Sequence, residues 1–382
     1  MLLQNLHIIG HDTVKDLRIG DDRIQEIACN LSPVSDEIQL EFDNAIAFPG
    51  LINSHDHLDF NLFPQLGNQV YKSYREWGED IQKNDREIIE SVLGVPGEIR
   101  IKWGLYKNLV NGFTTVVNHG KHIEIPNPFI NVFQECHSLH SVREKGWKFK
   151  LNRPFAGKQP FVIHVGEGVD QAAFEEIDEL VRWNLFKRKI IAVHGVSMDM
   201  RQAPAFEALV WCPASNLFML NATARVDKLK QETKILFGTD STLSAEWNAW
   251  EHIRLARETE MLNDDELFQS LTKHPAEAWS LNDRGVLGEG KKADIVIATK
   301  KNDGKNMDDF FQLNPEDILL VVCAGKIVLF DESLHSLLAN LTATNQFGEL
   351  IVNGSIKWVI GNPDALIKEI KNYLPGVKLF DQ

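Results

Sequence analysis

Four segments of the sequence place a histidine or a carboxylate directly after a run of apolar residues. They are PGLINSHDHL with His55 and His57, FVIHVGEG with His164 and Glu167, IIAVHG with His194, and ILFGTDS with Asp240. Three imidazoles and one carboxylate suit Zn²⁺ or Fe²⁺ and leave a coordination position open for water. An ion held in this way lowers the pKa of water to about 7, so these residue types predict metal-assisted hydrolysis. Glu167 is then free to move a proton, and His194 to orient the attacking water.

The spacing of His55 and His57 places both side chains on one side of a strand, because side chains alternate along an extended chain. Alone, such a pair carries little weight, since ordinary loop residues produce the same pattern. The four motifs together carry more, because each follows a strand-like run and the runs recur at the spacing of βα units. We therefore expect these side chains to meet at the carboxyl end of a parallel sheet.

Eight apolar runs supply the strands that would position these groups. They lie at residues 45–57, 113–118, 129–136, 147–151, 161–164, 190–194, 209–213 and 235–240. The run at 147–151, WKFKL, is the least convincing strand. Helical periodicity is clearest after the fifth run, where one face is predicted to carry Phe174, Ile177, Leu180, Val181 and Leu185. This alternation predicts an α/β fold: a (β/α)8 TIM barrel spanning residues 49–284.

The two ends of the chain have a different pattern. Residues 1–48 contain short strands with turn residues between them, such as Gly20-Asp21-Asp22, and such strands need partners. Apolar runs bounded by glycine and charge follow residue 285, in GVLGEGKKADIVIATK and DILLVVCAGKIVLFDE. We expect residues 1–48 and 285–382 to form one small composite β domain, with a further strand pair and a closing helix capped at Asn362-Pro363-Asp364.

Composition limits the classes of partner. The 382 residues carry a formal net charge of -14, which argues against nucleic-acid and anionic-membrane binding because both need clustered Lys and Arg. The first residues, MLLQNLHIIG, lack the pattern of a signal peptide, and no apolar run is long enough for a membrane helix. Four scattered cysteines form no C-x-x-C pair. We expect a cytoplasmic enzyme with a small-molecule substrate, and a homodimer is one possible assembly.

The series PGxINxHxH, HxxE, VHG, CPxSN and GTDS resembles the amidohydrolase superfamily, in its cytosine deaminase and atrazine chlorohydrolase-like branch. The segment HPAEAWSLNDRGVLGEGKKADIVI also resembles the barrel exit of that family. The resemblance implies one divalent transition metal, zinc first and iron second. Its implied ligands are His55, His57, His164 and Asp240. It also implies that Glu167 shuttles protons and that His194 hydrogen-bonds the hydrolytic water.

The chain departs from this family between Asn118 and Phe161, where it is short. Four histidines in that region are interpreted as solvated loop residues, with lining of the pocket as the alternative: His119, His122, His137 and His140. In WCPASN, Ser215 and Asn216 suit a turn-capping role as well as a substrate-binding one.

These observations predict a hydrolase of non-peptide carbon–nitrogen bonds that deaminates a small N-heterocyclic or amidine-like substrate. Asp240 would take the water proton, and Glu167 would protonate a ring nitrogen. Dechlorination or cyclic amide hydrolysis on the same site is the nearest alternative. Another is a binuclear site in which His164 and His194 bind a second metal and a carboxylated Lys148 or Lys150 bridges the two ions. A catalytically silent binding protein of the same fold is the rival of a different class.

Overall fold

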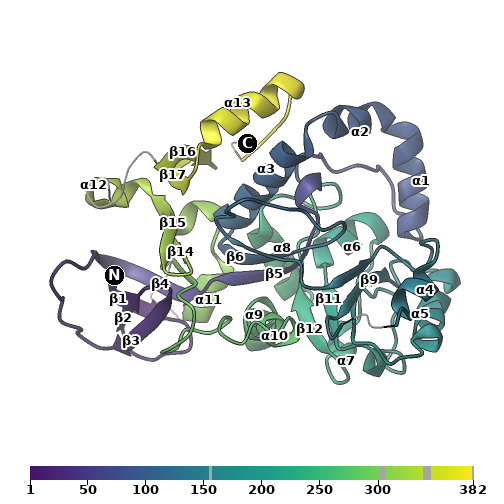
Figure 1. Cartoon of the computed structure of the whole chain (residues 1–382), viewed down its shortest axis with the longest axis horizontal. Coiled ribbons are helices and arrows are strands. Elements are labelled where there is room, and N and C mark those ends of the chain that lie inside the picture. The colour runs from purple at the N-terminus through teal and green to yellow at the C-terminus, as the bar shows by residue number, and fades with distance from the viewer. Residues whose placement is uncertain (155–156, 302–305, 339–345, 381–382) are drawn as a thin grey trace.

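The computed structural model is a mixed α/β structure, described for residues 1–154, 157–301, 306–338 and 346–380. Figure 1 shows two regions: a mostly β region that contains the N-terminus, and a larger region in which helices surround strands. No helix in the described part of the chain is both long and apolar enough to cross a membrane.

A nine-stranded sheet contains strands from both ends of the chain. Its order is β16 (Phe347–Val352), β17 (Ser355–Ile360), β15 (Lys326–Asp331), β14 (Ile318–Cys323), β13 (Ile295–Thr299), β4 (Gln39–Pro49), β1 (Leu2–Ile8), β2 (Lys15–Gly20) and β3 (Arg23–Ala28). β4 pairs antiparallel with β13, with Ala47 opposite Ile297. Apolar side chains from both halves, such as Leu6, Phe42 and Leu320, form one buried cluster on this sheet. The turn predicted at Gly20-Asp21-Asp22 lies between β2 and β3.

Two all-parallel sheets form the second region. One has the order β5 (Leu51–Asp56), β6 (Phe113–Asn118) and β7 (Asn131–Phe133). The other has the order β12 (Lys234–Phe237), β11 (Ala208–Trp211), β10 (Ile190–His194), β9 (Phe161–Val165) and β8 (His137–Leu139). β12 lies beside β5, and just beyond it the Asp240 amide donates to the His55 carbonyl at 3.0 Å. Within the described residues, no strand pairing is found between β7 and β8.

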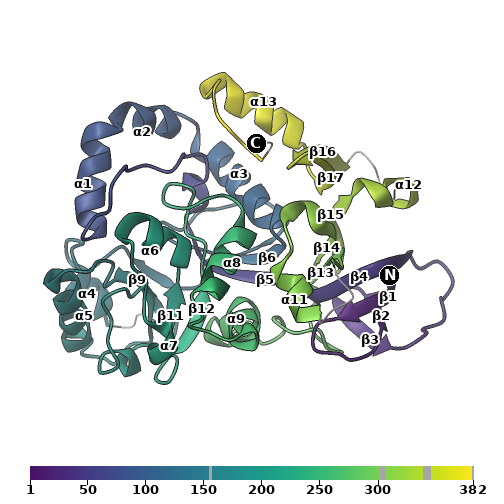
Figure 2. The ribbon, with the colours of Figure 1, turned by 180° about the vertical axis from the view of Figure 1, so that it is seen from behind.

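Helices surround these strands in both views of the chain (Figures 1 and 2). Those between β5 and β9 are α1 (Tyr74–Asn84), α2 (Arg86–Leu93), α3 (Gly97–Val110) and α4 (Trp147–Leu151). The later ones are α5 (Gln171–Trp183), α6 (Pro213–Leu220), α7 (Val226–Leu229), α8 (Ala249–Glu258), α9 (Asp264–Leu271), α10 (Lys273–Ala278), α11 (Asn306–Phe311), α12 (His335–Leu338) and α13 (Pro363–Tyr373). The predicted cap of α13 is confirmed, since Asn362 accepts from the Ala365 amide at 3.0 Å. Beyond α13, the chain returns to α3, where Phe380 stacks on Trp103 at 4.3 Å.

The predicted strand at 147–151 is wrong. This segment is α4, because Trp147 and Leu151, four residues apart, share one buried face while Phe149 between them is 72% exposed. The alternation of apolar and basic residues in WKFKL imitated a strand. β7 and β8 instead both lie within residues 131–139, with no helix between them.

Two further sequence predictions need adjustment. The run at 45–57 is divided between β4 of the nine-stranded sheet and β5 of the parallel sheet, with Gly50 between them. On α5, Ile177 and Leu180 are buried as predicted, but Val181 and Leu185 are exposed. The helix ends at Trp183, so the stripe is shorter than the periodicity suggested.

Removal of residues 1–48 should cause aggregation, because it takes away β4 and exposes the hydrogen-bonding edge of β13. The expected observation is loss of the monodisperse peak in size-exclusion chromatography. A chain limited to residues 48–281 that remained soluble and bound metal at the full level would contradict this expectation.

Candidate active site

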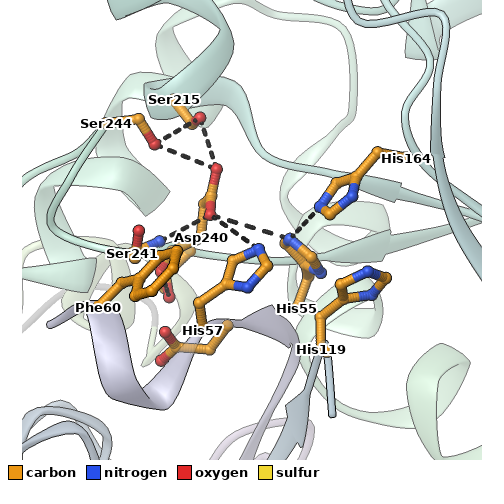
Figure 3. Close-up of polar contacts among 12 residues, drawn as sticks. His55, His57, Phe60, His119, His164, Ser215, Asp240, Ser241 and Ser244 are labelled. Carbon is orange, nitrogen blue, oxygen red and sulfur yellow. Dashed lines mark hydrogen bonds and ion pairs between the residues drawn. The ribbon is translucent and has the colours of Figure 1, made fainter. Parts of the chain in front are cut away.

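The side chains singled out in the sequence lie together at the carboxyl ends of the parallel strands. His55 and His194 belong to the ends of β5 and β10, and His164 to β9. His57 and Asp240 follow the last residues of β5 and β12 (Figure 3). Two of these residues have positive φ, 72° at His194 and 57° at Asp240, which is uncommon for residues other than glycine. Such conformations cluster at functional sites, where the surrounding structure offsets their cost.

Three histidines and one carboxylate converge on one point. The Nε2 atoms of His55 and His164 are 3.2 Å apart. Asp240 Oδ1 lies 3.8 Å from His55 Nε2 and 3.9 Å from His57 Nε2. The ligand atoms of His55, His57 and His164 all lie within 4.8 Å of one another. This donor set fits a divalent metal ion.

The electrostatics of the cluster favour the neutral imidazoles that metal ligation requires. Burial, followed by repulsion from neighbouring histidines, holds the pKa of His55 and of His164 well below the usual range. Burial opposes ionisation of Asp240, but His194, His57 and the Ser215 hydroxyl outweigh it and lower its pKa. At neutral pH the cluster therefore offers imidazole lone pairs and an ionised carboxylate.

Asp240 is oriented by a set of donors behind it. The hydroxyls of Ser215 and Ser244 donate to Oδ2 at 2.8 and 3.1 Å. The Ser241 amide donates to Oδ1 at 2.8 Å. Figure 3 shows Asp240 between the serines on one side and His55 and His57 on the other. Ser215 thus supports a site carboxylate, a role that differs from both alternatives in the sequence analysis.

Glu167 and His194 form a pair beside this cluster. Glu167 Oε1 lies 3.4 Å from His194 Nε2, and the Asn216 amide Nδ2 lies 2.9 Å from His194 Nδ1. With Nδ1 accepting from Asn216, the imidazole proton is on Nε2 and faces Glu167. Burial, then the charges of Asp240 and Glu176, raise the pKa of Glu167 well above its usual range. Burial lowers the pKa of His194 to about 4. Glu167 is therefore suited to hold a proton that it can donate.

Comparison with known proteins finds similarity to one enzyme family. The model of the Amidohydrolase family matches residues 160–328. The 5-methylthioadenosine/S-adenosylhomocysteine deaminase of Dictyoglomus turgidum is 23% identical over 361 residues, covering 78% of this chain and 84% of the relative. The chain is therefore similar to amidohydrolases over residues 160–328 and to a deaminase over most of its length.

Solved structures of similar fold contain zinc. Atrazine chlorohydrolase from Arthrobacter aurescens TC1, complexed with zinc, has a TM-score of 0.67 at 18% identity, covering 90% of this chain and 99% of that one. An adenosine deaminase from Xanthomonas campestris with bound zinc has a TM-score of 0.64 at 15% identity, with coverages of 98% and 97%. Together with the cluster of histidines and Asp240 in this chain, they support a divalent metal as the cofactor.

The interpretation of His119 as a solvated loop residue is wrong. Only 4% of it is exposed, and its ring centre lies 4.3 Å from that of His164. Like the ligand candidates, it comes directly after the end of a strand, β6, and that position was the available signal. Its Nε2 lies 3.3 Å from the Ser138 hydroxyl, and its ring packs against His55 and His164 without lining the site cavity.

The other three histidines of this region differ in their roles. His140 is exposed, but its carbonyl is 2.9 Å from His164 Nδ1, which directs Nε2 of His164 into the cluster. The His140 side chain also lines the site cavity. His122 and His137 line a separate cavity beside α4, so the alternative that they line the site cavity is not supported.

A buried polar network under the site was also missed. Lys107, on α3, donates to the Asp240 carbonyl at 2.9 Å and to Asn61 Oδ1 at 2.8 Å, and lies 3.3 Å from Asp56 Oδ2. Asp56, the last residue of β5, stands between His55 and His57 in the chain and also accepts from the Asn108 amide at 2.7 Å. The network connects α3 to the ends of β5 and β12. A lysine in the apolar segment IKWGLYKNLV was the signal in the sequence.

Neither lysine proposed to bridge two metal ions in the binuclear alternative lies at the site. Lys148 is 2.7 Å from Glu179, and Lys150 is ion-paired with Glu144, both on the exposed surface of α4. Neither lysine lines the site cavity, which has a volume of about 110 Å³.

Glu176 should make the stability of the protein depend on pH. It accepts from the Gly166 amide at 2.8 Å, and burial raises its pKa from 4.5 to about 7. Because the folded state then holds this proton more tightly than the unfolded state, stability should fall as pH rises from 4.5 to 7. The free energy of unfolding in urea should be measured at pH 5 and at pH 8. Its decrease between these two pH values should be about 1–3 kcal/mol smaller in Glu176→Gln than in the wild-type protein. An unchanged difference would contradict the assignment.

Proposed function

We propose that this protein is an amidohydrolase that removes an amino group from a small N-heterocycle. It is a hydrolase that acts on non-peptide carbon–nitrogen bonds. The observation that carries the proposal is the Glu167–His194 pair beside the cluster of three histidines and Asp240. Deamination of an amidine-like carbon needs a proton donor for the adjacent ring nitrogen, and Glu167 has the position and the raised pKa for that task.

One divalent ion, zinc first and iron second, is proposed at His55, His57, His164 and Asp240. When bound, this ion supplies water activated for attack at neutral pH. Asp240 accepts the proton of that water, and its serine donors keep Oδ1 facing the reaction centre. His194 directs its Nε2 proton toward the same space. Glu167 donates a proton to the ring nitrogen, and the proton that Asp240 accepted passes to the amino group, which leaves as ammonia. The hydroxyl now bound to carbon returns its proton to Glu167 as the carbonyl forms.

The strands β5 to β12 are proposed to be a (β/α)8 barrel spanning residues 49–284. β12 lies beside β5, and the solved relatives with TM-scores above 0.6 share the fold. Residues 1–48 with 285–382 are proposed as the composite β domain, because β4 pairs with β13.

The proposed activity is tested by ammonia release from the zinc-loaded protein. The substrates should be aminated pyrimidines, purines, pterins and triazines, together with the nucleosides of these bases. Ammonia from at least one compound is expected. Release of chloride from a chlorinated triazine with no ammonia from any compound would favour the chlorohydrolase alternative. Ligand binding without any hydrolysis would indicate a catalytically silent protein.

The metal content should be one ion per chain, measured by elemental analysis of the fully loaded protein. His55→Ala should lose the ion and retain most of its fold, since residues at strand ends contribute more to chemistry than to the core. The exposed His122→Ala is a matched control and should keep the ion. Two ions per chain in the wild-type protein would contradict the mononuclear site.

A further inference from the structure

The site cavity is small, and its wall outside the ligand cluster is largely apolar. Its volume is about 110 Å³. The aromatic and aliphatic side chains that line it are Phe60, Tyr74, Trp77, Met219 and Leu243. An apolar cavity of about 150 Å³ holds one benzene ring. A cavity of this order therefore holds about one six-membered ring, and a sugar attached to that ring would extend beyond it.

Residues 66–77, which we call the cover segment, contribute Tyr74 and Trp77 to the wall of the cavity. Backbone hydrogen bonds join it to three different parts of the site. The Leu66 amide donates to the Leu243 carbonyl at 3.0 Å, the Tyr71 amide to the Met219 carbonyl at 2.9 Å, and the Tyr74 amide to the Glu167 carbonyl at 3.1 Å. The cover segment is thus tied to the segments that follow β9, β11 and β12.

Close packing at Gly168 shows how tightly this segment lies against the site. A side-chain Cβ at Gly168 would come within 2.9 Å of the Lys72 carbonyl oxygen and 3.0 Å of Ser73 Cβ. The Val169 amide also donates to the Lys72 carbonyl at 2.8 Å. On the other side of the segment, the Trp77 indole donates to the Leu66 carbonyl at 2.7 Å, which holds the ring in place as a wall of the cavity.

The polar groups of the cavity suit a flat ring better than a sugar. Among the described residues that line it, the only carboxylates are Glu167 and Asp240, and both face the reaction centre. Ser244 already donates to Asp240. The hydroxyls of a ribose would therefore meet mainly aromatic and aliphatic surface, where unpaired polar groups are unfavourable.

We infer that the substrate is a free single-ring N-heterocycle bearing an amino group, and not a nucleoside. This inference rests on the proposed deamination. It separates the chain from relatives such as the 5-methylthioadenosine/S-adenosylhomocysteine deaminase, whose names specify nucleoside substrates. The cover segment acts as the specificity element, because Tyr74 and Trp77 limit the width of the cavity.

Binding of deamination products tests the inference without turnover. Titration calorimetry on the zinc-loaded protein should compare the single rings uracil, 2-hydroxypyrimidine and cyanuric acid with the nucleosides uridine and inosine. At least one single ring should bind at least about 100-fold more tightly than either nucleoside. A nucleoside that binds as tightly as every single ring, or no binding of any single ring, would overturn the inference. Ammonia release tests the deamination separately, so the two can fail independently.

A variant of the cover segment provides a second readout. Trp77→Ala should widen the cavity and raise the affinity for uridine relative to uracil by at least about 10-fold, with metal content unchanged. Trp183→Ala, at a half-exposed tryptophan on α5, is the matched control and should leave the ratio unchanged. If Trp77→Ala does not fold, Trp77→Leu offers a smaller widening. An unchanged ratio in a folded variant would show that the cover segment does not select against the sugar.

Discussion

Glu167→Gln should bind metal at the wild-type level and turn over about 10²–10⁴ times more slowly, which is the usual contribution of a positioned general acid or base. The substitution keeps the shape of the side chain and removes its titrating group. Glu167 contacts His194 and not the ligand atoms, so the ion should not be affected. Metal content by elemental analysis and turnover on an identified substrate are the two measurements.

Two further variants test whether the expected effect is specific to Glu167. His164→Asn, three residues earlier, should lose metal and activity together, because His164 Nε2 points at the centre of the cluster. Glu175→Gln, an exposed residue of α5, should change neither quantity. If Glu167→Gln also lost the ion, Glu167 would be a ligand. If it kept both metal and full turnover, the proton donor would lie elsewhere and deamination would lose its main support.

Lys107→Met should reduce the free energy of unfolding by about 3–5 kcal/mol, the typical cost of removing one partner from a buried ion pair. Only 1% of Lys107 is exposed, and Asp56 is completely buried. Without the ammonium group, the Asp56 carboxylate would remain in the core with only amide donors. The Asp240 carbonyl would also lose the lysine donor and keep only that of the Thr239 hydroxyl at 3.0 Å. Urea unfolding of the metal-free protein measures the loss.

The double variant Asp56→Asn, Lys107→Met separates the charge effect from packing. Because it removes both charges, it should recover about 0.5–3 kcal/mol relative to the sum of the single variants. Lys102→Met, at an exposed position of the same helix, should be neutral within about 0.5 kcal/mol. Strict additivity of the two single changes would mean that Asp56 and Lys107 are not energetically coupled.

The elements that the sequence predicted well are those with a local cause. β6 and β10 were predicted with their observed bounds because each is a short apolar run between helical or turn segments. α4 was predicted wrongly because five residues of WKFKL fit both periods, and only burial of Trp147 and Leu151 on the same side selects the helix. The short connection between β7 and β8 could not be derived either, since it depends on pairing with β6 and β9.

The residues of the site also fall into those with a local signal in the sequence and those without one. The six principal side chains could be recognised because each stands at the end of an apolar run, and parallel strands bring their carboxyl ends to one edge. The residues that orient them could not be recognised, because their partners are distant in the chain. Ser215 and Asp240 are 25 residues apart, and Lys107 and the Asp240 carbonyl 133. His119 was misjudged for the same reason: its burial comes from neighbours such as His55 and His164.

The proposed chemistry of this protein is therefore encoded locally, in residue types that follow strands, whereas its proposed selectivity depends on tertiary structure. Which groups could bind a metal and move a proton follows from short motifs. The volume open to substrate depends on where residues 66–77 lie, and hydrogen bonds to residues about 90 to 180 positions later hold them there. No periodicity within the cover segment specifies those contacts, because their partners Glu167, Met219 and Leu243 follow three different strands far along the chain.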